Sequence, residues 1–236
     1  RSLVGSEMCI RDRKMLLVMT VGFTLLPVPV SLDIRGWTEM HPLNGPAWSL
    51  FFEYIANILY AVLIRKFTSR WLAVLVFLAA CALIHQCYTQ GNNIGGWTLD
   101  VEQCRVGLTR LMFPFFGGLL LFRLCKPGRV RHGFWWCSLL LVGALAMPHV
   151  GGAENFHLNG LYDAFCIIVI FPAVVFLGAS DIPGDISSRA SRFLGNISYP
   201  LYITHYPIVY LYLAWVHDAE VPFSRALPVA VGVLFI

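Results

Sequence analysis

The sequence predicts an all-α protein: a polytopic transmembrane helical bundle with about 7–8 spanning helices and no sizeable soluble domain. Its composition is 58% hydrophobic and 13% charged, whereas an ordinary soluble domain has roughly 25% charged residues. Apolar runs recur along the chain, several of them near the roughly 20 residues that span a bilayer as a helix. The formal net charge of +4 does not indicate nucleic-acid binding, because the basic residues lie in short loops between these runs.

The first 13 residues differ from the rest of the chain. The stretch RSLVGSEMCIRDR has no apolar core, so we expect neither a signal peptide nor the start of a helix there. It resembles the translation of a sequencing-library transposase adapter, and a genuine cytoplasmic leader is the alternative. We therefore expect 1–13 to be a non-native leader and 14–236 to form one transmembrane domain. The last residues lie within an apolar run, so we expect a truncated C-terminus.

The hydrophobic pattern predicts eight spanning segments, of which the first and fifth are short and the last is incomplete. Their boundaries are uncertain by several residues. In chain order they are 14–30, 45–64, 71–87, 104–123, 134–148, 160–178, 195–216 and 226–236.

Charges in the connecting loops predict the orientation of these segments. Alternate loops are basic, and the intervening loops carry few Lys or Arg but several acids. This alternation follows the positive-inside rule and places the basic loops in the cytoplasm. The basic loops contain Arg65, Lys66 and Arg70, then Arg123, Lys126, Arg129 and Arg131, and then Arg189 and Arg192.

The cysteines and histidines give no metal site. The seven cysteines form no C-x-x-C pair, and most lie in apolar runs, where a free Cys behaves as a small hydrophobe. Cys87 and Cys104 flank a predicted outer loop and could pair in an oxidising compartment, although free thiols are the favoured alternative. In another outer loop, His149, Glu154 and His157 have no metal-ligand spacing, so we expect solvated loop residues.

Glu53 is an unusual residue for a spanning helix. A carboxylate at the bilayer centre costs roughly 2.5–3.5 kcal/mol on insertion scales, so it is usually retained for a function. Ser49, Glu53, Asn57 and Tyr60 share one helix face, which we expect to face a protein interior or a wet cavity. The alternative is a structural carboxylate that is hydrogen-bonded to a neighbouring helix.

The residues before Glu53 form a turn-rich entry to this helix. Asn44 is a candidate helix N-cap, and Pro46 fits the first turn. Trp48, taken alone, suits packing or an interfacial anchor.

Arg110 lies inside another apolar stretch and needs a partner, for which Glu53 is the leading intramembrane candidate. Pro114 is expected to kink this helix, and Gly117 and Gly118 to permit close approach of another helix. An Arg near a kink suits binding of an anionic group such as phosphate. A structural ion pair is an equal alternative.

A third polar set lies in the segment that begins near residue 195. Ser198, Tyr202 and His205 share one helix face. A buried His can transfer protons near neutral pH, although a lone helical His more often only satisfies a hydrogen bond.

These segments resemble the integral-membrane acyltransferase 3 family. Residues 44–53, NGPAWSLFFE, resemble its N-x-x-x-W-S-L-x-x-E signature, and residues 194–205, LGNISYPLYITH, resemble its late G-x-I-S-Y-x-x-Y-x-x-H helix. The stretch 110–124 also fits. The resemblance covers roughly residues 20–236.

The resemblance implies an enzyme that transfers an acyl group, commonly acetyl, from cytoplasmic acyl-CoA to a hydroxyl of a sugar or surface polysaccharide. Carbohydrate or glycolipid acceptors and membrane lipid are then the expected partners, with no bound cofactor, no metal and no nucleic acid. The expected location is the bacterial cytoplasmic membrane. Glu53 and His205 would have supporting catalytic roles, and the substrate contacts would be Asn44, Trp48, Ser49, Arg110 and Tyr202.

The resemblance also implies that this sequence is a C-terminal fragment. The family's proposed catalytic His, in its first helix, and an R-x-x-R element before its third helix are not in this sequence. His41 lies in a loop and is not a substitute. We therefore expect the chain to be inactive alone.

Two other functions fit the residues without the resemblance. Glu53, Arg110 and His205 could form the proton or substrate path of a secondary transporter. Inverted repeats would favour that function, and none is visible in the sequence. A structural membrane subunit is the other alternative, against which the polar face of Glu53 argues.

Overall fold

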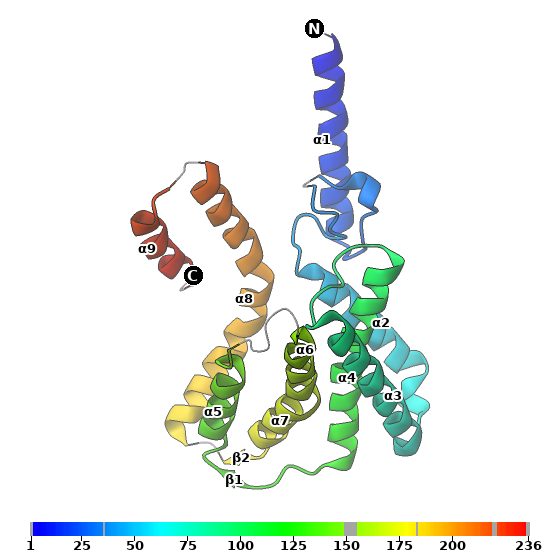
Figure 1. The fold of residues 1–236 in the computed structure, drawn as a ribbon, viewed down its shortest axis with the longest axis vertical. Coiled ribbons are helices and arrows are strands. Elements are labelled where there is room, and N and C mark those ends of the chain that lie inside the picture. Colours follow the sequence, from blue (N-terminus) through cyan, green and yellow to red (C-terminus); the bar gives the residue numbers. More distant parts are fainter. Residues whose placement is uncertain (1, 35, 149–154, 183, 219–220, 235–236) are drawn as a thin grey trace. The chain divides into compact units, whose positions relative to one another are not determined.

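The computed structural model describes residues 2–34, 36–148, 155–182, 184–218 and 221–234. Within these ranges the chain is helical apart from loops and one pair of two-residue strands (Figure 1). It divides into two compact units, described separately below. One unit is Arg1–Trp48 with Phe193–Ile236, and the other is Ser49–Arg192.

The α-helices of the described chain form eight segments, and each overlaps one of the eight predicted segments. α6 continues through a π-helical stretch, Cys166–Ile170, into α7, so these elements make one segment. The helices are α1 Ser2–Gly22, α2 Ala47–Val62, α3 Ser69–Gln90, α4 Val101–Leu124, α5 Gly133–Leu145, α6 Phe156–Phe165, α7 Phe171–Ala179, α8 Asp185–Asp218 and α9 Phe223–Leu234.

Among the described residues, three helical segments are long and apolar enough to cross a membrane: α3, α4 and the continuous segment Phe156–Ala179. α2 and α5 are apolar but shorter. The all-helical prediction is therefore confirmed, whereas the structure supports fewer full-length spans than the seven or eight predicted.

The first helix differs from its prediction at both ends. It begins at Ser2, so the expectation that residues 1–13 start no helix was wrong. It ends at Gly22 rather than near residue 30. Pro27 and Pro29 explain the early end, because proline lacks an N–H and disfavours helical geometry in the residue before it.

Helix packing in the unit Ser49–Arg192 depends on close contacts at two glycines. α3 packs against α4 and α6. A Cβ on Gly160 of α6 would clash with the backbone carbonyl of Cys87 in α3, and one on Gly107 of α4 would clash with the ring of Phe52 in α2. The buried side chains of this core are Leu72, Ala79, Leu83, Cys87, Phe113, Phe116 and Ala164, with Ile64 beside them.

The prediction that Gly117 and Gly118 permit close helix approach was wrong. The three atoms nearest to a Cβ on Gly117 all belong to Phe113 of the same helix, and a Cβ on Gly118 would meet nothing within 4 Å. Cys87 and Cys104 are both free in the structure, as the favoured alternative has it, so the possible bond between them is not formed.

The loops of this unit gather at opposite ends of its helices. At one end, β1 (Val130–Arg131) pairs in parallel with β2 (Asp181–Ile182), as Figure 1 shows. At the same end of α4, the Arg123 guanidinium donates to the carbonyl of Phe67, 2.7 Å away. These contacts bring the loops after α2, α4 and α7 together. Arg189 and Arg192, expected in the last of these loops, lie in α8 instead.

Candidate functional site

Two hydrogen bonds join the two signature segments in the unit Arg1–Trp48 with Phe193–Ile236. The Asn44 side-chain amide donates from Nδ2 to the carbonyl of Ile203 at 3.0 Å. The Tyr202 hydroxyl donates to the carbonyl of Pro46, also at 3.0 Å. The structure therefore places the entry to α2 against the middle of α8, although these residues are more than 150 positions apart in the sequence.

The predicted N-cap role of Asn44 was wrong. The N–H of Ala47, the first residue of α2, donates to the backbone carbonyl of Asn44 at 2.9 Å. Within the described chain, the buried side-chain Oδ1 of Asn44 accepts no hydrogen bond. The Asn44 side chain therefore serves the contact with α8 rather than the start of α2.

A buried carboxylate lies beside these two segments. Glu39 is only 8% exposed, and its Oε1 and Oε2 accept from the Tyr210 hydroxyl at 3.0 and 3.3 Å. Gly45 makes room for this contact, because a Cβ there would lie 3.0 Å from Glu39 Oε1 and 3.1 Å from the Tyr210 hydroxyl. Glu39 is one of the acids in the loops with few Lys or Arg, and no pattern in the sequence singles it out.

Two further aromatic rings, from two segments of the chain, pack on Tyr210, the hydrogen-bond partner of this carboxylate. Trp37 meets Tyr210 edge-on with ring centroids 5.5 Å apart, and Tyr206 meets Tyr210 at 4.4 Å. Edge-to-face pairs of this kind are favourable beyond the area that they bury. No periodicity in the sequence marks the cluster, since its members come from a loop and from α8.

His41 is buried in the loop before α2. It is 5% exposed, and its Nε2 lies 3.1 Å from the carbonyl of Leu25. A carbonyl only accepts, so Nε2 carries the proton of this bond. Burial lowers the pKa of His41, with the bond to Leu25 acting in the opposite direction. The imidazole is therefore neutral near physiological pH.

His205 is hydrogen-bonded within its own helix, as one of its two alternatives expects. Its Nδ1 lies 2.9 Å from the carbonyl of Tyr202 and 3.0 Å from that of Leu201, both in its own helix. Because carbonyls only accept, Nδ1 carries a proton, and in the neutral ring Nε2 then holds the lone pair. His205 is thus hydrogen-bonded within α8 and still presents a proton-accepting nitrogen.

Glu53 lies in the other unit and differs from its expected environment. It is exposed, because the packed face of α2 carries Phe52 and Ala56 instead. The expectation that the Glu53 face is turned into the interior was therefore wrong for this unit. Among the described residues, the Glu53 carboxylate makes no hydrogen bond or ion pair, and Asn57 donates to its backbone carbonyl at 2.9 Å. Ser49, at intermediate exposure, lies one turn earlier in α2.

Arg110 bonds to a loop rather than to Glu53. Its guanidinium donates to the carbonyl of Gly95. The same loop is held by Gln103, whose Oε1 accepts from the N–H of Gly96 at 2.6 Å, and by Asp163, whose Oδ2 accepts from the N–H of Asn93 at 3.1 Å. Arg110 therefore takes part in fastening the 91–96 loop to α4 and α6, and its predicted pairing with Glu53 is not formed.

The histidines and acids of the described ranges form no cluster that could hold a metal ion. His149 and Glu154 lie outside the described residues. His157 stacks on Tyr88 with ring centroids 4.5 Å apart.

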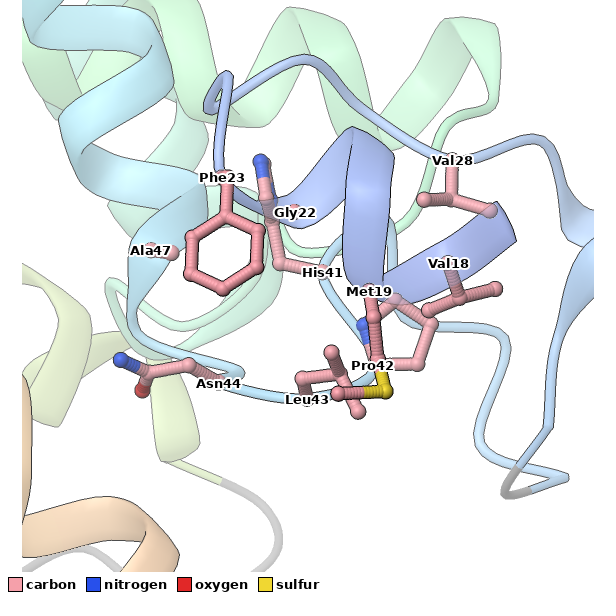
Figure 2. Close-up of a pocket in the computed structure, with 10 residues that line it drawn as sticks. All are labelled: Val18, Met19, Gly22, Phe23, Val28, His41, Pro42, Leu43, Asn44 and Ala47. Carbon is pink, nitrogen blue, oxygen red and sulfur yellow. The ribbon is translucent and has the colours of Figure 1, made fainter. Parts of the chain in front are cut away.

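A cavity of about 210 Å³ adjoins Asn44 (Figure 2). The last turn of α1 and the segment before α2 form its walls, so it lies wholly within one unit. Only two of its lining residues are polar, His41 and Asn44. The lining residues are Val18, Met19, Gly22, Phe23, Val28, His41, Pro42, Leu43, Asn44 and Ala47.

The sequence of this chain matches one known protein family. Residues 11–236 match a family model described as an acyltransferase domain, which spans both units. No match was found among curated proteins or among solved structures. The match confirms the resemblance carried by residues 44–53 and 194–205 and favours an enzyme over a transporter. The chain belongs to the acyltransferase 3 family and is a membrane acyltransferase.

Proposed function

We propose that this enzyme transfers an acyl group, such as acetyl, from acyl-CoA to a hydroxyl of a sugar or surface polysaccharide in the bacterial cytoplasmic membrane. The observation that supports it best is the pair of hydrogen bonds between Asn44 and Ile203 and between Tyr202 and Pro46. These bonds bring the two segments that carry the family signatures to one place.

The reaction requires a base and a means of holding two substrates. The acceptor oxygen attacks the thioester carbonyl carbon, a C–O bond forms, the C–S bond breaks, and CoA leaves as a thiolate that takes up a proton. A base must take the proton of the attacking hydroxyl. His205 supports this step through Nε2, since its Nδ1 is held by the carbonyls of Leu201 and Tyr202.

The remaining predicted residues have binding or supporting roles in this proposal. Asn44 and Tyr202 position the substrates beside His205, while Trp48, Ser49 and Arg110 contribute further contacts. Glu53 acts as an accessory carboxylate that orients or polarises the base or lines the substrate path. Its exposed position supports a function better than the structural alternative, because no neighbouring helix among the described residues hydrogen-bonds to its carboxylate.

The first test is Glu53→Gln in the intact enzyme. The substitution keeps the size of the side chain and removes its charge. We expect transfer of radiolabelled acetyl from acetyl-CoA to envelope polysaccharide to fall by roughly 100-fold or more, the scale of acid–base contributions. The measurement uses membranes that contain equal amounts of inserted enzyme.

Tyr54→Phe is the matched control, because Tyr54 is the next residue of α2 and is 63% exposed. It should transfer acetyl at the wild-type rate. Near-normal transfer by a correctly inserted Glu53→Gln enzyme would remove Glu53 from the proposed mechanism.

A further inference from the structure

The apolar cavity beside Asn44 has no part in the roles assigned above. At about 210 Å³ it is larger than an engineered apolar cavity of about 150 Å³ that binds benzene, a six-carbon ligand. Scaled by volume, the cavity would hold about eight carbons. Its walls are side chains such as Val18, Val28 and Leu43, which offer no hydrogen bonds.

The two polar residues of the lining use their donors outside the cavity. His41 donates from Nε2 to Leu25, and Asn44 donates from Nδ2 to Ile203. Figure 2 shows the Asn44 amide directed away from Met19 and Leu43. Asn44 Oδ1 is a buried acceptor without a hydrogen bond in the described chain, but eight of the ten lining residues are apolar, so most of the lining suits a hydrocarbon.

We propose that this cavity holds the aliphatic chain of the acyl group being transferred, and that it admits chains of up to about eight carbons. The inference rests on the proposed function. Asn44 links the cavity to the proposed site, since it lines the cavity and also bonds to α8 next to Tyr202 and His205. An acyl chain in the cavity would have the proposed site at its Asn44 end.

Gly22 gives a way to fill the cavity without disturbing the backbone. It is the last residue of α1, and a Cβ there would meet only Leu43 Cδ1, at an ordinary 3.7 Å. Gly22→Leu therefore places a branched side chain in the cavity. Gly118→Leu is the matched control, because a Cβ on Gly118 in α4 meets nothing within 4 Å.

The first experiment measures binding. The full chain in lipid nanodiscs is photolabelled with an eight-carbon acyl-CoA that carries a diazirine at the end of its chain, and the adducts are mapped by mass spectrometry. We expect adducts on Val18, Met19 or Phe23, a loss of at least tenfold in Gly22→Leu, and unchanged labelling in Gly118→Leu. Octanoyl-CoA should compete with the label.

Two outcomes would overturn the inference at this stage. One is labelling spread over other residues or unaffected by Gly22→Leu. The other is competition by added phospholipid but not by octanoyl-CoA, which would assign the cavity to a bilayer lipid chain.

The second experiment separates this inference from the proposed function. Transfer is measured in the intact enzyme with acetyl-, butyryl- and octanoyl-CoA. Gly22→Leu should raise the KM for octanoyl-CoA at least tenfold relative to that for acetyl-CoA, and Gly118→Leu should leave the ratio unchanged. An unchanged ratio in Gly22→Leu would refute the cavity assignment while transfer itself stands. If no acyl-CoA supports transfer, the proposed function fails and the photolabelling result decides the cavity.

Discussion

At the scale of single residues, Glu39 and His41 show how a loop can contain buried, chemically capable side chains. Both lie between α1 and α2, where the sequence indicates only a Gly- and Pro-rich connection. Their burial follows from contacts with Tyr210, 171 positions away from Glu39, and with Leu25. Buried polar groups need such partners, because losing a hydrogen bond in the interior leaves the desolvation cost uncompensated.

Tyr210→Phe tests the contact with Glu39. The change removes the hydroxyl donor to a buried carboxylate, and a hydrogen bond to a charged group contributes about 1.5–3 kcal/mol. We expect the free energy of unfolding to fall by an amount in that range, measured by denaturant titration in detergent. Tyr199→Phe, at an exposed position of the same helix, should change it little. Equal effects of the two substitutions would contradict a specific role for the Glu39 contact.

The burial of His41 should make the free energy of unfolding depend on pH. Burial lowers its pKa in the folded state below the ordinary value of 6.5, so the unfolded chain binds the proton first as the pH falls. The stability is fully present above about pH 6.5 and is lost as the pH falls from there through the folded-state pKa. Unfolding temperatures measured between pH 8 and 5 should therefore drop on the acid side.

His41→Gln should flatten that drop, because Gln can still donate to Leu25 but does not titrate. The exposed His85 provides the comparison, and His85→Gln should keep the wild-type slope. An acid-side drop of wild-type size in His41→Gln would show that His41 is not its source.

At the scale of elements, the α3–α6 contact depends on a residue without a side chain. The backbone of Cys87 occupies the space that a Cβ on Gly160 would need. Since this neighbour is backbone and not the end of a flexible side chain, the helices themselves would have to separate. Small residues at such crossings let membrane helices approach closely.

Gly160→Ala should therefore destabilise the protein by about 1–3 kcal/mol, the usual cost of overpacking. Gly118→Ala offers the opposite case, because its Cβ meets open space and Ala is favoured over Gly in a helix by roughly 0.5–1 kcal/mol. The two variants can be compared by thermal unfolding in the same detergent. A Gly160→Ala protein as stable as Gly118→Ala would argue against the close crossing.

At the scale of the whole molecule, the loop contacts give the charge pattern a structural basis. Arg123 bonds to Phe67, and β1 pairs with β2, so the basic loops after α2 and α4 and the connection before α8 gather at one end of the unit Ser49–Arg192. The other end holds the 91–96 loop, where Asn93 bonds to Asp163. The positive-inside rule then assigns the basic end to the cytoplasm.

This orientation can be checked with a membrane-impermeant maleimide in a chain whose other cysteines are replaced. Cys125, exposed beside the basic end of α4, should react only after the membrane is permeabilised. Ile94→Cys, 61% exposed at the other end, should react in intact spheroplasts. The reverse pattern would invert the proposed topology.

Composition and apolar periodicity were enough to predict the class and the order of the eight helical segments, because these follow from local patterns. The family followed from the resemblance of two motifs to a known family. Local patterns did not predict which side chains are buried or which polar groups hydrogen-bond to one another. The sequence placed Glu53 on a polar face, but which face of α2 is packed depends on Phe52 meeting Gly107 in another helix.

The sequence by itself thus determined that the chain forms apolar helices and that residues 44–53 and 194–205 belong to one kind of enzyme. Tertiary structure alone decided that Asn44 bonds to α8, that Glu39 is buried against Tyr210, and that Arg110 fastens a loop instead of pairing with Glu53. The physical reason is distance along the chain. Helix formation is set by neighbours within a few residues, whereas these polar contacts join residues 15 to 171 positions apart.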